Sequence, residues 1–147
     1  MHRLLHGEVG SGKTVVALLA ALQTVAAGAQ AALIAPTDLL AEQLYGRAAD
    51  VLAPAGVRVA LLRASQRGSE RRAALEGLAA GTIGVAVGTH ALLEAGVRFG
   101  RLGLAIVDEQ HRFGVAQRLT LAAKGPHPHL LVMSATPIPR ILALTLY

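Results

Sequence analysis

Short apolar runs alternate with helical patterns along almost the whole chain, and this alternation restricts the fold more than any other feature. The runs consist mostly of Ala, Val, Leu and Ile, as expected for strands that are covered on both faces. Strands that alternate with helices form a mostly parallel sheet with helices packed on both sides. The predicted strands cover residues 31–35, 57–62, 83–87, 102–107 and 130–133, and a further strand is expected at the start of the chain. The sequence therefore predicts an α/β fold with three layers, α/β/α.

Three helices are predicted between these strands. They cover residues 13–27, 38–52 and 69–80. Gly28 and Gly81 are expected to stop the first and the third, and Ser69 is expected to cap the third. The side chains expected to be buried are Leu40, Leu44, Ala48 and Val51 in the second helix, and Leu75, Leu78 and Ala79 in the third.

A polar signature follows most of the apolar runs. In chain order the signatures read GEVGSGKT (7–14), PTDLL (36–40), GTH (88–90), DEQH (108–111) and SATPIP (134–139). Ligands of such folds bind at the carboxyl ends of the parallel strands. We therefore expect these five signatures to gather at one edge of the sheet and to form the functional site.

Residues 7–14 fit the phosphate-binding pattern Gly-x-x-x-x-Gly-Lys-Thr, with Gly7, Gly12, Lys13 and Thr14 at the required positions. Glycines let backbone N–H groups approach a phosphate closely, and the following helix dipole and Lys13 add positive charge. The Thr14 hydroxyl is then left to hold Mg²⁺. Taken alone, the loop could also be an ordinary Gly-rich turn between a strand and a helix.

The DEQH signature supplies the carboxylates that a phosphate-binding loop lacks. Asp108 directly follows a predicted strand, where it can hold Mg²⁺ through water from the side opposite Thr14. Glu109 is the candidate general base, because a carboxylate near the γ-phosphate can deprotonate the attacking water. Adjacent acids after a strand can instead cap a helix. The presence of Lys13 and Thr14 upstream favours the catalytic interpretation.

Composition limits the class of protein. A chain of 147 residues with 53% hydrophobic and 16% charged residues fits one globular domain. No charged residue lies between Thr14 and Thr37, and this run is long enough to span a membrane. However, Gln23 and Gln30 lie within the run and Gly28 divides it, so a buried helix followed by a buried strand is expected and no membrane role. The absence of cysteine gives no sign of an oxidising compartment, so a cytoplasmic location is predicted.

The chain is basic, with a formal net charge of +5 from 14 Lys and Arg against nine Asp and Glu. Such a surface suits a polyanionic partner. Aromatic residues make up only 3%, so platforms for base stacking are largely missing. Any contact with DNA is therefore expected to involve mostly the phosphate backbone.

The signatures resemble motifs I, Ia, Ib, II and III of the superfamily 2 helicases. The segments that carry this resemblance are GEVGSGKT, APTDLLAEQ, VAVGTHALL, IVDEQHRFGVAQR and MSATPIPR, and they extend over nearly the whole chain. Within the superfamily the chain is most similar to the RecG-type ATP-dependent DNA helicases, which remodel stalled forks and branched junctions. DEQHRFG with Gln117 and Arg118, and ATPIPR followed by LALTLY, are the most specific segments. The resemblance implies a RecA-like P-loop NTPase domain that uses ATP and Mg²⁺.

The resemblance also implies roles for individual residues. By this resemblance, the residues that bind ATP are Gly7, Glu8, Val9, Gly10, Ser11, Gly12, Lys13 and Thr14. Thr14 and Asp108 bind the metal, and Lys13, Asp108 and Glu109 take part in catalysis. Coupling of nucleotide state to domain movement falls to Gln110, His111, Ser134 and Thr136, and DNA contact to Pro36, Thr37, Gly88 and Thr89. Arg67, Arg71, Arg72, Arg112 and Arg140 are candidates for phosphate contacts or, equally, charges on solvated faces.

Three residues depart from the usual motifs of the family, and some of its usual segments are expected outside residues 1–147. Ile141 stands where Thr is usual, Glu8 where Asp is usual, and Ser134 where Thr is usual. Residues 1–147 are expected to form the first RecA-like domain, truncated at its N-terminus. The adenine-contacting segment, the wedge domain and the second RecA-like domain are expected to lie outside it. Because the second domain would supply an arginine finger worth about 10³ to 10⁵ in rate, the isolated chain is expected to bind ATP weakly and hydrolyse it poorly.

Other functional classes stay open on sequence grounds. The corresponding domain of a transcription-repair coupling translocase is one alternative, since those proteins have similar DEEHRFG and ATPIPR motifs; Gln110 and Ser11 favour the RecG type. A stand-alone P-loop ATPase or kinase and a non-catalytic binding module are the remaining alternatives. The whole interpretation requires that Lys13 and the acidic pair Asp108 and Glu109 lie on the same side of the molecule, close enough to share a triphosphate.

Overall fold

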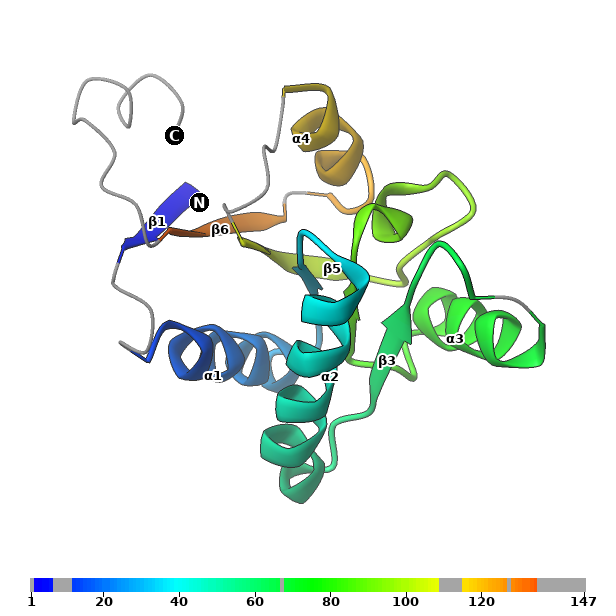
Figure 1. The fold of residues 1–147 in the computed structure, drawn as a ribbon, viewed down its shortest axis with the longest axis horizontal. Coiled ribbons are helices and arrows are strands. Elements are labelled where there is room, and N and C mark those ends of the chain that lie inside the picture. The colour runs from blue at the N-terminus through cyan, green and yellow to red at the C-terminus, as the bar shows by residue number, and fades with distance from the viewer. Residues whose placement is uncertain (1, 7–11, 67, 109–114, 127, 135–147) are drawn as a thin grey trace.

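The structure is a computed structural model of the chain, and it describes residues 2–6, 12–66, 68–108, 115–126 and 128–134. Six strands form one sheet: β1 (His2–His6), β2 (Gln30–Ile34), β3 (Val59–Leu62), β4 (Val85–Gly88), β5 (Leu102–Asp108) and β6 (His129–Ser134). Their order across the sheet is β1-β6-β5-β2-β4-β3, and every pairing is parallel (Figure 1). The predicted mostly parallel sheet is confirmed.

The described helices are α1 (Lys13–Ala26), α2 (Asp38–Leu52), α3 (Ser69–Ala80) and α4 (Val115–Ala122), with short 3₁₀ turns η1 (Ala53–Ala55) and η2 (His90–Leu93). The first three match the predicted helices, whereas α4 and both 3₁₀ turns were not predicted. Gly28 and Gly81 adopt left-handed backbone conformations at the ends of α1 and α3, as the stop prediction required. The predicted cap at Ser69 is wrong, because Gly68 occupies the N-cap position and Ser69 is already helical.

Two cores lie on opposite faces of the sheet. Helices α1 and α2 cover one face, and α3, η2 and α4 cover the other (Figure 1). Successive strand residues point alternately into the two cores. Leu33, Val87 and Ile106 enter the first core, and Ile34, Ala86 and Val107 enter the second. This arrangement confirms the three-layer α/β/α architecture.

The helix faces predicted to be buried are partly wrong. In α2 the fully buried residues are Ala41, Ala48 and Leu52, while Leu40 and Leu44 pack at the edge of the core and Val51 is 48% exposed. In α3 the buried residues are Ala74 and Leu78, while Ala79 is exposed. Small alanines face the sheet at the contact points, so each helix is rotated from the position that its largest side chains suggested.

The uncharged run between Thr14 and Thr37 folds as α1 followed by β2, as predicted. None of the helices in the described part of the chain has the length and apolar character needed to cross a bilayer. Gln30, within this run, is only 3% exposed. Its side-chain nitrogen Nε2 donates to the carbonyl oxygens of Leu78 (2.9 Å) and Ile83 (2.8 Å), and its Oε1 accepts from the Arg101 N–H (2.8 Å). Gln30 thereby joins the start of β2 to α3 and to the segments that lead into β4 and β5.

Candidate nucleotide site at the carboxyl edge of the sheet

Strand register brings the predicted signatures to one edge. His6, which ends β1, pairs with Ser134 at the end of β6, and Met133 of β6 pairs with Asp108 at the end of β5. Because β1, β6 and β5 are consecutive in the sheet, the segments that follow them leave from neighbouring positions. These segments are the 7–14 loop, the SAT signature and the DEQH signature.

The start of α1 has the geometry expected after a phosphate-binding loop. Gly12 is the N-cap, with a left-handed φ of 89°, and the helix begins at Lys13. Among the residues that the structure describes, none lies within 4 Å of a Cβ atom added to Gly12, so the left-handed backbone angle is the reason found for the glycine here. The first turn of α1 contains no acidic residue. Its N–H groups and positive dipole end therefore favour an anion.

A cavity of about 530 Å³ lies at this edge and brings predicted metal ligands together. Thr14 from the first turn of α1 and Asp108 from the end of β5 both line it. The cavity falls within the usual range of ligand pockets, about 300 to 1,000 Å³. A hydroxyl and a carboxylate are oxygen donors of the kind that Mg²⁺ prefers. The donor set therefore fits the metal that the sequence predicted.

Helix α2 contributes four residues to the lining of this cavity, and the two polar ones, Gln43 and Arg47, were not predicted as site residues. Gln43 and Arg47 lie one helical turn apart and border the same space as Thr14. Their i, i+4 spacing shows in the sequence that they share a helix face. Only the packing of α2 against the sheet shows that this face reaches the cavity.

The residues predicted to contact DNA lie at the ends of β2 and β4. Thr37 is exposed and caps α2, because its hydroxyl accepts a hydrogen bond from the Leu40 N–H at 3.2 Å. Thr89 is only 7% exposed; it occupies the N-cap position of η2 but makes no side-chain cap bond to it. Pro36 is partly exposed.

Gly88 has a packing reason for being glycine. A Cβ atom at this position would lie 2.4 Å from the carbonyl oxygen of Leu62 and 3.0 Å from Cγ of Leu92. The end of β4 is thus pressed between β3 and η2. The glycine serves this close approach whatever else it contacts.

Several predicted residues lie outside the described part of the chain. They are Gly7, Glu8, Val9, Gly10, Ser11, Glu109, Gln110, His111, Thr136, Arg67, Arg112 and Arg140. Their assigned roles stay predictions, as do the chemical roles of Lys13, Thr14, Asp108 and Ser134. Of the arginines left open between phosphate contact and a solvated face, Arg71 forms an ion pair with Glu94 at 2.8 Å, and Arg72 is exposed.

Known proteins that resemble this chain in sequence and in fold are helicases. The ATP-dependent DNA helicase RecG of Escherichia coli O127:H6 is 54% identical over 151 aligned residues, which cover 100% of this chain and 22% of that protein. A solved structure of RecG bound to a three-way DNA junction matches 99% of this chain and 19% of its own, with a TM-score of 0.82 and 46% identity. The Mycobacterium smegmatis helicase Lhr bound to single-stranded DNA and AMP-PNP matches 90% of this chain and 19% of its own, at 16% identity and a TM-score of 0.71, which shows the shared fold.

The chain spans about a fifth of the length of the relatives that it matches. The family model for DEAD/DEAH box helicases matches residues 2–144, which include every signature at the sheet edge. ATP-dependent helicases use a nucleotide, in agreement with the predicted cofactor class. This chain belongs to the DEAD/DEAH box helicase family.

Proposed function

We propose that residues 1–147 form the ATP-binding motor domain of a RecG-like helicase, which uses ATP hydrolysis to remodel branched DNA in recombination and repair. The observation that carries the proposal is the cavity shared by Thr14 and Asp108, which come from segments far apart in the sequence. Strong identity to RecG proteins supports the choice of branched DNA as the substrate. A cytoplasmic location stays a prediction.

In this proposal the chain supplies binding and positioning around the phosphates. Lys13 and the N–H groups of the 7–14 loop hold the β- and γ-phosphates. Thr14 and Asp108 would hold Mg²⁺ through their side-chain oxygens. Bound Mg²⁺ would offset the negative charge that develops on the phosphate oxygens. Glu109 orients the attacking water and accepts its proton.

The remaining residues carry the effect of hydrolysis to DNA. Gln110, His111, Ser134 and Thr136 couple the nucleotide state to movement between this domain and a second RecA-like domain. Pro36, Thr37, Gly88 and Thr89 lie along the DNA backbone. An arginine from the second domain completes the site, so residues 1–147 alone bind ATP weakly and turn it over slowly.

The test compares ATP turnover with and without the Glu109→Gln substitution, in a chain extended through the second RecA-like domain. Loss of the general base should lower turnover by about 10²- to 10⁴-fold while ATP binding persists. Unchanged turnover in the variant would favour a non-catalytic binding module. Unwinding of a forked duplex by residues 1–147 alone would contradict the proposed need for a second domain.

A further inference from the structure

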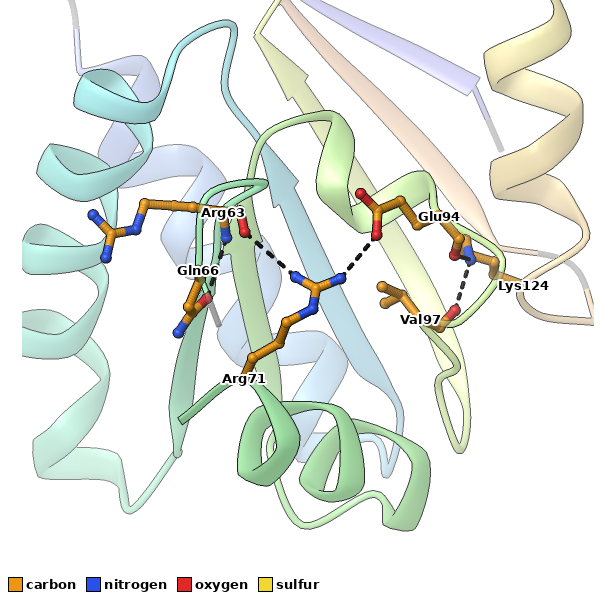
Figure 2. Close-up of polar contacts among 6 residues, drawn as sticks. All are labelled: Arg63, Gln66, Arg71, Glu94, Val97 and Lys124. Carbon is orange, nitrogen blue, oxygen red and sulfur yellow. Dashed lines mark hydrogen bonds and ion pairs between the residues drawn. The ribbon is translucent and has the colours of Figure 1, made fainter. Parts of the chain in front are cut away.

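A chain of polar contacts holds residues 90–97, the segment that starts at the last residue of the GTH signature, from one side (Figure 2). The Arg71 guanidinium, from the first turn of α3, bridges two groups. Its Nη2 pairs with Glu94 Oε2 at 2.8 Å, and its Nη1 donates to the carbonyl oxygen of Arg63 at 3.3 Å. Arg63 directly follows β3 and forms an ion pair with Glu42 of α2. Arg71 therefore ties the 90–97 segment to the end of β3.

Lys124 holds the same segment from the other side. Its ammonium Nζ donates to the carbonyl oxygens of Glu94 (2.8 Å) and Val97 (2.6 Å). Figure 2 shows Arg71 and Lys124 approaching the segment from opposite directions. Burial lowers the pKa of Lys124, and the nearby Glu94 carboxylate partly offsets this effect. Lys124 lies in the turn after α4, so the segment is fixed between α3 and α4.

The segment held in this way is the direct continuation of β4. Ala91, Leu92 and Val97 anchor it in the core, and the Leu92 N–H donates to the Thr89 carbonyl oxygen at 3.1 Å. The side chains of His90 and Gln117 of α4 also lie within 3.4 Å of each other. A shift of residues 90–97 would therefore move the end of β4, where Gly88 and Thr89 lie.

We propose that Arg71 and Lys124 are positioning residues, which hold residues 90–97 so that the Gly88–Thr89 end of β4 is placed to meet the DNA backbone. This inference rests on the proposed function, because it assumes that this edge contacts DNA. Arg71 uses its charge on Glu94 and not on a phosphate. Loss of either contact lowers the fraction of molecules in the DNA-binding conformation, so apparent DNA affinity falls in proportion.

The test uses the full-length gene product and measures ATP hydrolysis at rising concentrations of a forked DNA duplex. For Lys124→Met, the DNA concentration that gives half-maximal stimulation should rise by about five- to tenfold, because two carbonyl groups lose a charged donor. For Arg71→Met it should rise by about two- to fivefold, since the ion pair is partly exposed. Basal hydrolysis without DNA and the KM for ATP should stay unchanged. Lys124→Arg, which retains a charged donor, should recover most of the wild-type response.

Two matched variants separate positioning from general charge. Arg72→Met removes the same charge from the neighbouring exposed position and should have a smaller effect than Arg71→Met. Glu94→Ala removes a negative charge, so simple attraction to DNA would tighten binding, whereas loss of positioning weakens it. Tighter binding by Glu94→Ala, or equal effects of the Arg71 and Arg72 variants, would overturn the inference.

Separate measurements test whether each variant folds and whether the proposed function holds. Thermal unfolding of each variant reports whether it folds, and Arg71→Lys and Lys124→Gln serve if a Met variant does not. If the wild-type protein shows no DNA-stimulated hydrolysis, the proposed function fails and the inference fails with it. If the wild type is stimulated and the Arg71 and Lys124 variants respond as it does, only the inference fails.

Discussion

The two edges of the sheet use polar residues in opposite ways. At the amino edge, the buried Gln30 side chain makes its hydrogen bonds to backbone groups of the chain itself. A cavity of about 470 Å³ also lies there; Thr24, Arg101 and His129 border it together with apolar residues, and its described lining includes no carboxylate. At the carboxyl edge a cavity of about 530 Å³ is lined by Thr14, Arg47 and Asp108. The volumes are similar, so it is the chemistry of the lining that identifies the functional edge.

The largest expected effect is a loss of activity at the carboxyl edge. Lys13→Ala in the full-length gene product should lower ATP turnover by about 10³-fold, or roughly 4 kcal/mol of barrier, because under the proposed function it removes a fixed charge at the phosphates. Thermal stability should change little, since Lys13 is partly exposed. Steady-state ATPase assays and thermal unfolding measure the two effects. Retention of turnover would remove the functional distinction between the two edges.

Gly88→Ala should show that a residue at the carboxyl edge also contributes to the stability of the fold. The added Cβ would lie 2.4 Å from the Leu62 carbonyl oxygen, so we expect a loss of about 3 kcal/mol in the free energy of unfolding. Urea denaturation of residues 1–147, followed by circular dichroism, measures this change. Gly46→Ala is the matched control, because Gly46 lies within α2 and no atom of the described residues lies within 4 Å of an added Cβ. The control should gain about 0.5 to 1 kcal/mol; equal losses in the two variants would contradict the steric explanation.

At the amino edge, Gln30→Leu should lower stability and leave nucleotide chemistry intact. The carbonyl groups of Leu78 and Ile83 would lose a buried donor, at a cost of about 2 kcal/mol in the free energy of unfolding. The same urea experiment measures this cost, and ATPase assays should show little change under stabilising conditions. Gln23→Leu, at an exposed position of α1, should cost much less. A large loss of turnover in a folded Gln30 variant would mean that the amino edge takes part in function.

The smallest expected effect concerns Thr37, which lies at the carboxyl edge but also caps α2. Thr37→Ala should lower the free energy of unfolding by about 1 kcal/mol, because the Leu40 N–H loses its acceptor. Thr37→Ser keeps a hydroxyl and should restore most of this loss in the same denaturation experiment. Weaker DNA binding by a fully stable Thr37→Ser variant would show a role beyond capping.

Much of the fold could be predicted because the signals are local. The bounds of α2 and α3 match the prediction, since Thr37 and Gly81 act within a few residues of themselves. The faces of these helices could not be predicted as well. Val51 was expected to be buried but is exposed, because the choice between Val51 and Leu52 depends on how α2 rotates against the sheet.

The candidate site also contains residues that the sequence could identify and residues that it could not. Thr14 and Asp108 carry recognisable spacing and strand-end position, so the sequence could identify them. Gln43 and Arg47 could not be identified, because their face of α2 looks like any solvated helix face until the helix is packed. The role of Arg71 was left open for a similar reason, since its partner Glu94 lies in a different element.

The sequence by itself determined the alternation of strands and helices, the glycine stops and the polar signatures after most of the strands, because each depends on residues that are close along the chain. Only the tertiary structure decided which of these residues meet. Contacts between distant segments set the register between β1, β6 and β5 and the rotation of α2. Such contacts also fix residues 90–97 through Arg71 and Lys124. Such contacts depend on the packing of whole elements, which no local pattern specifies.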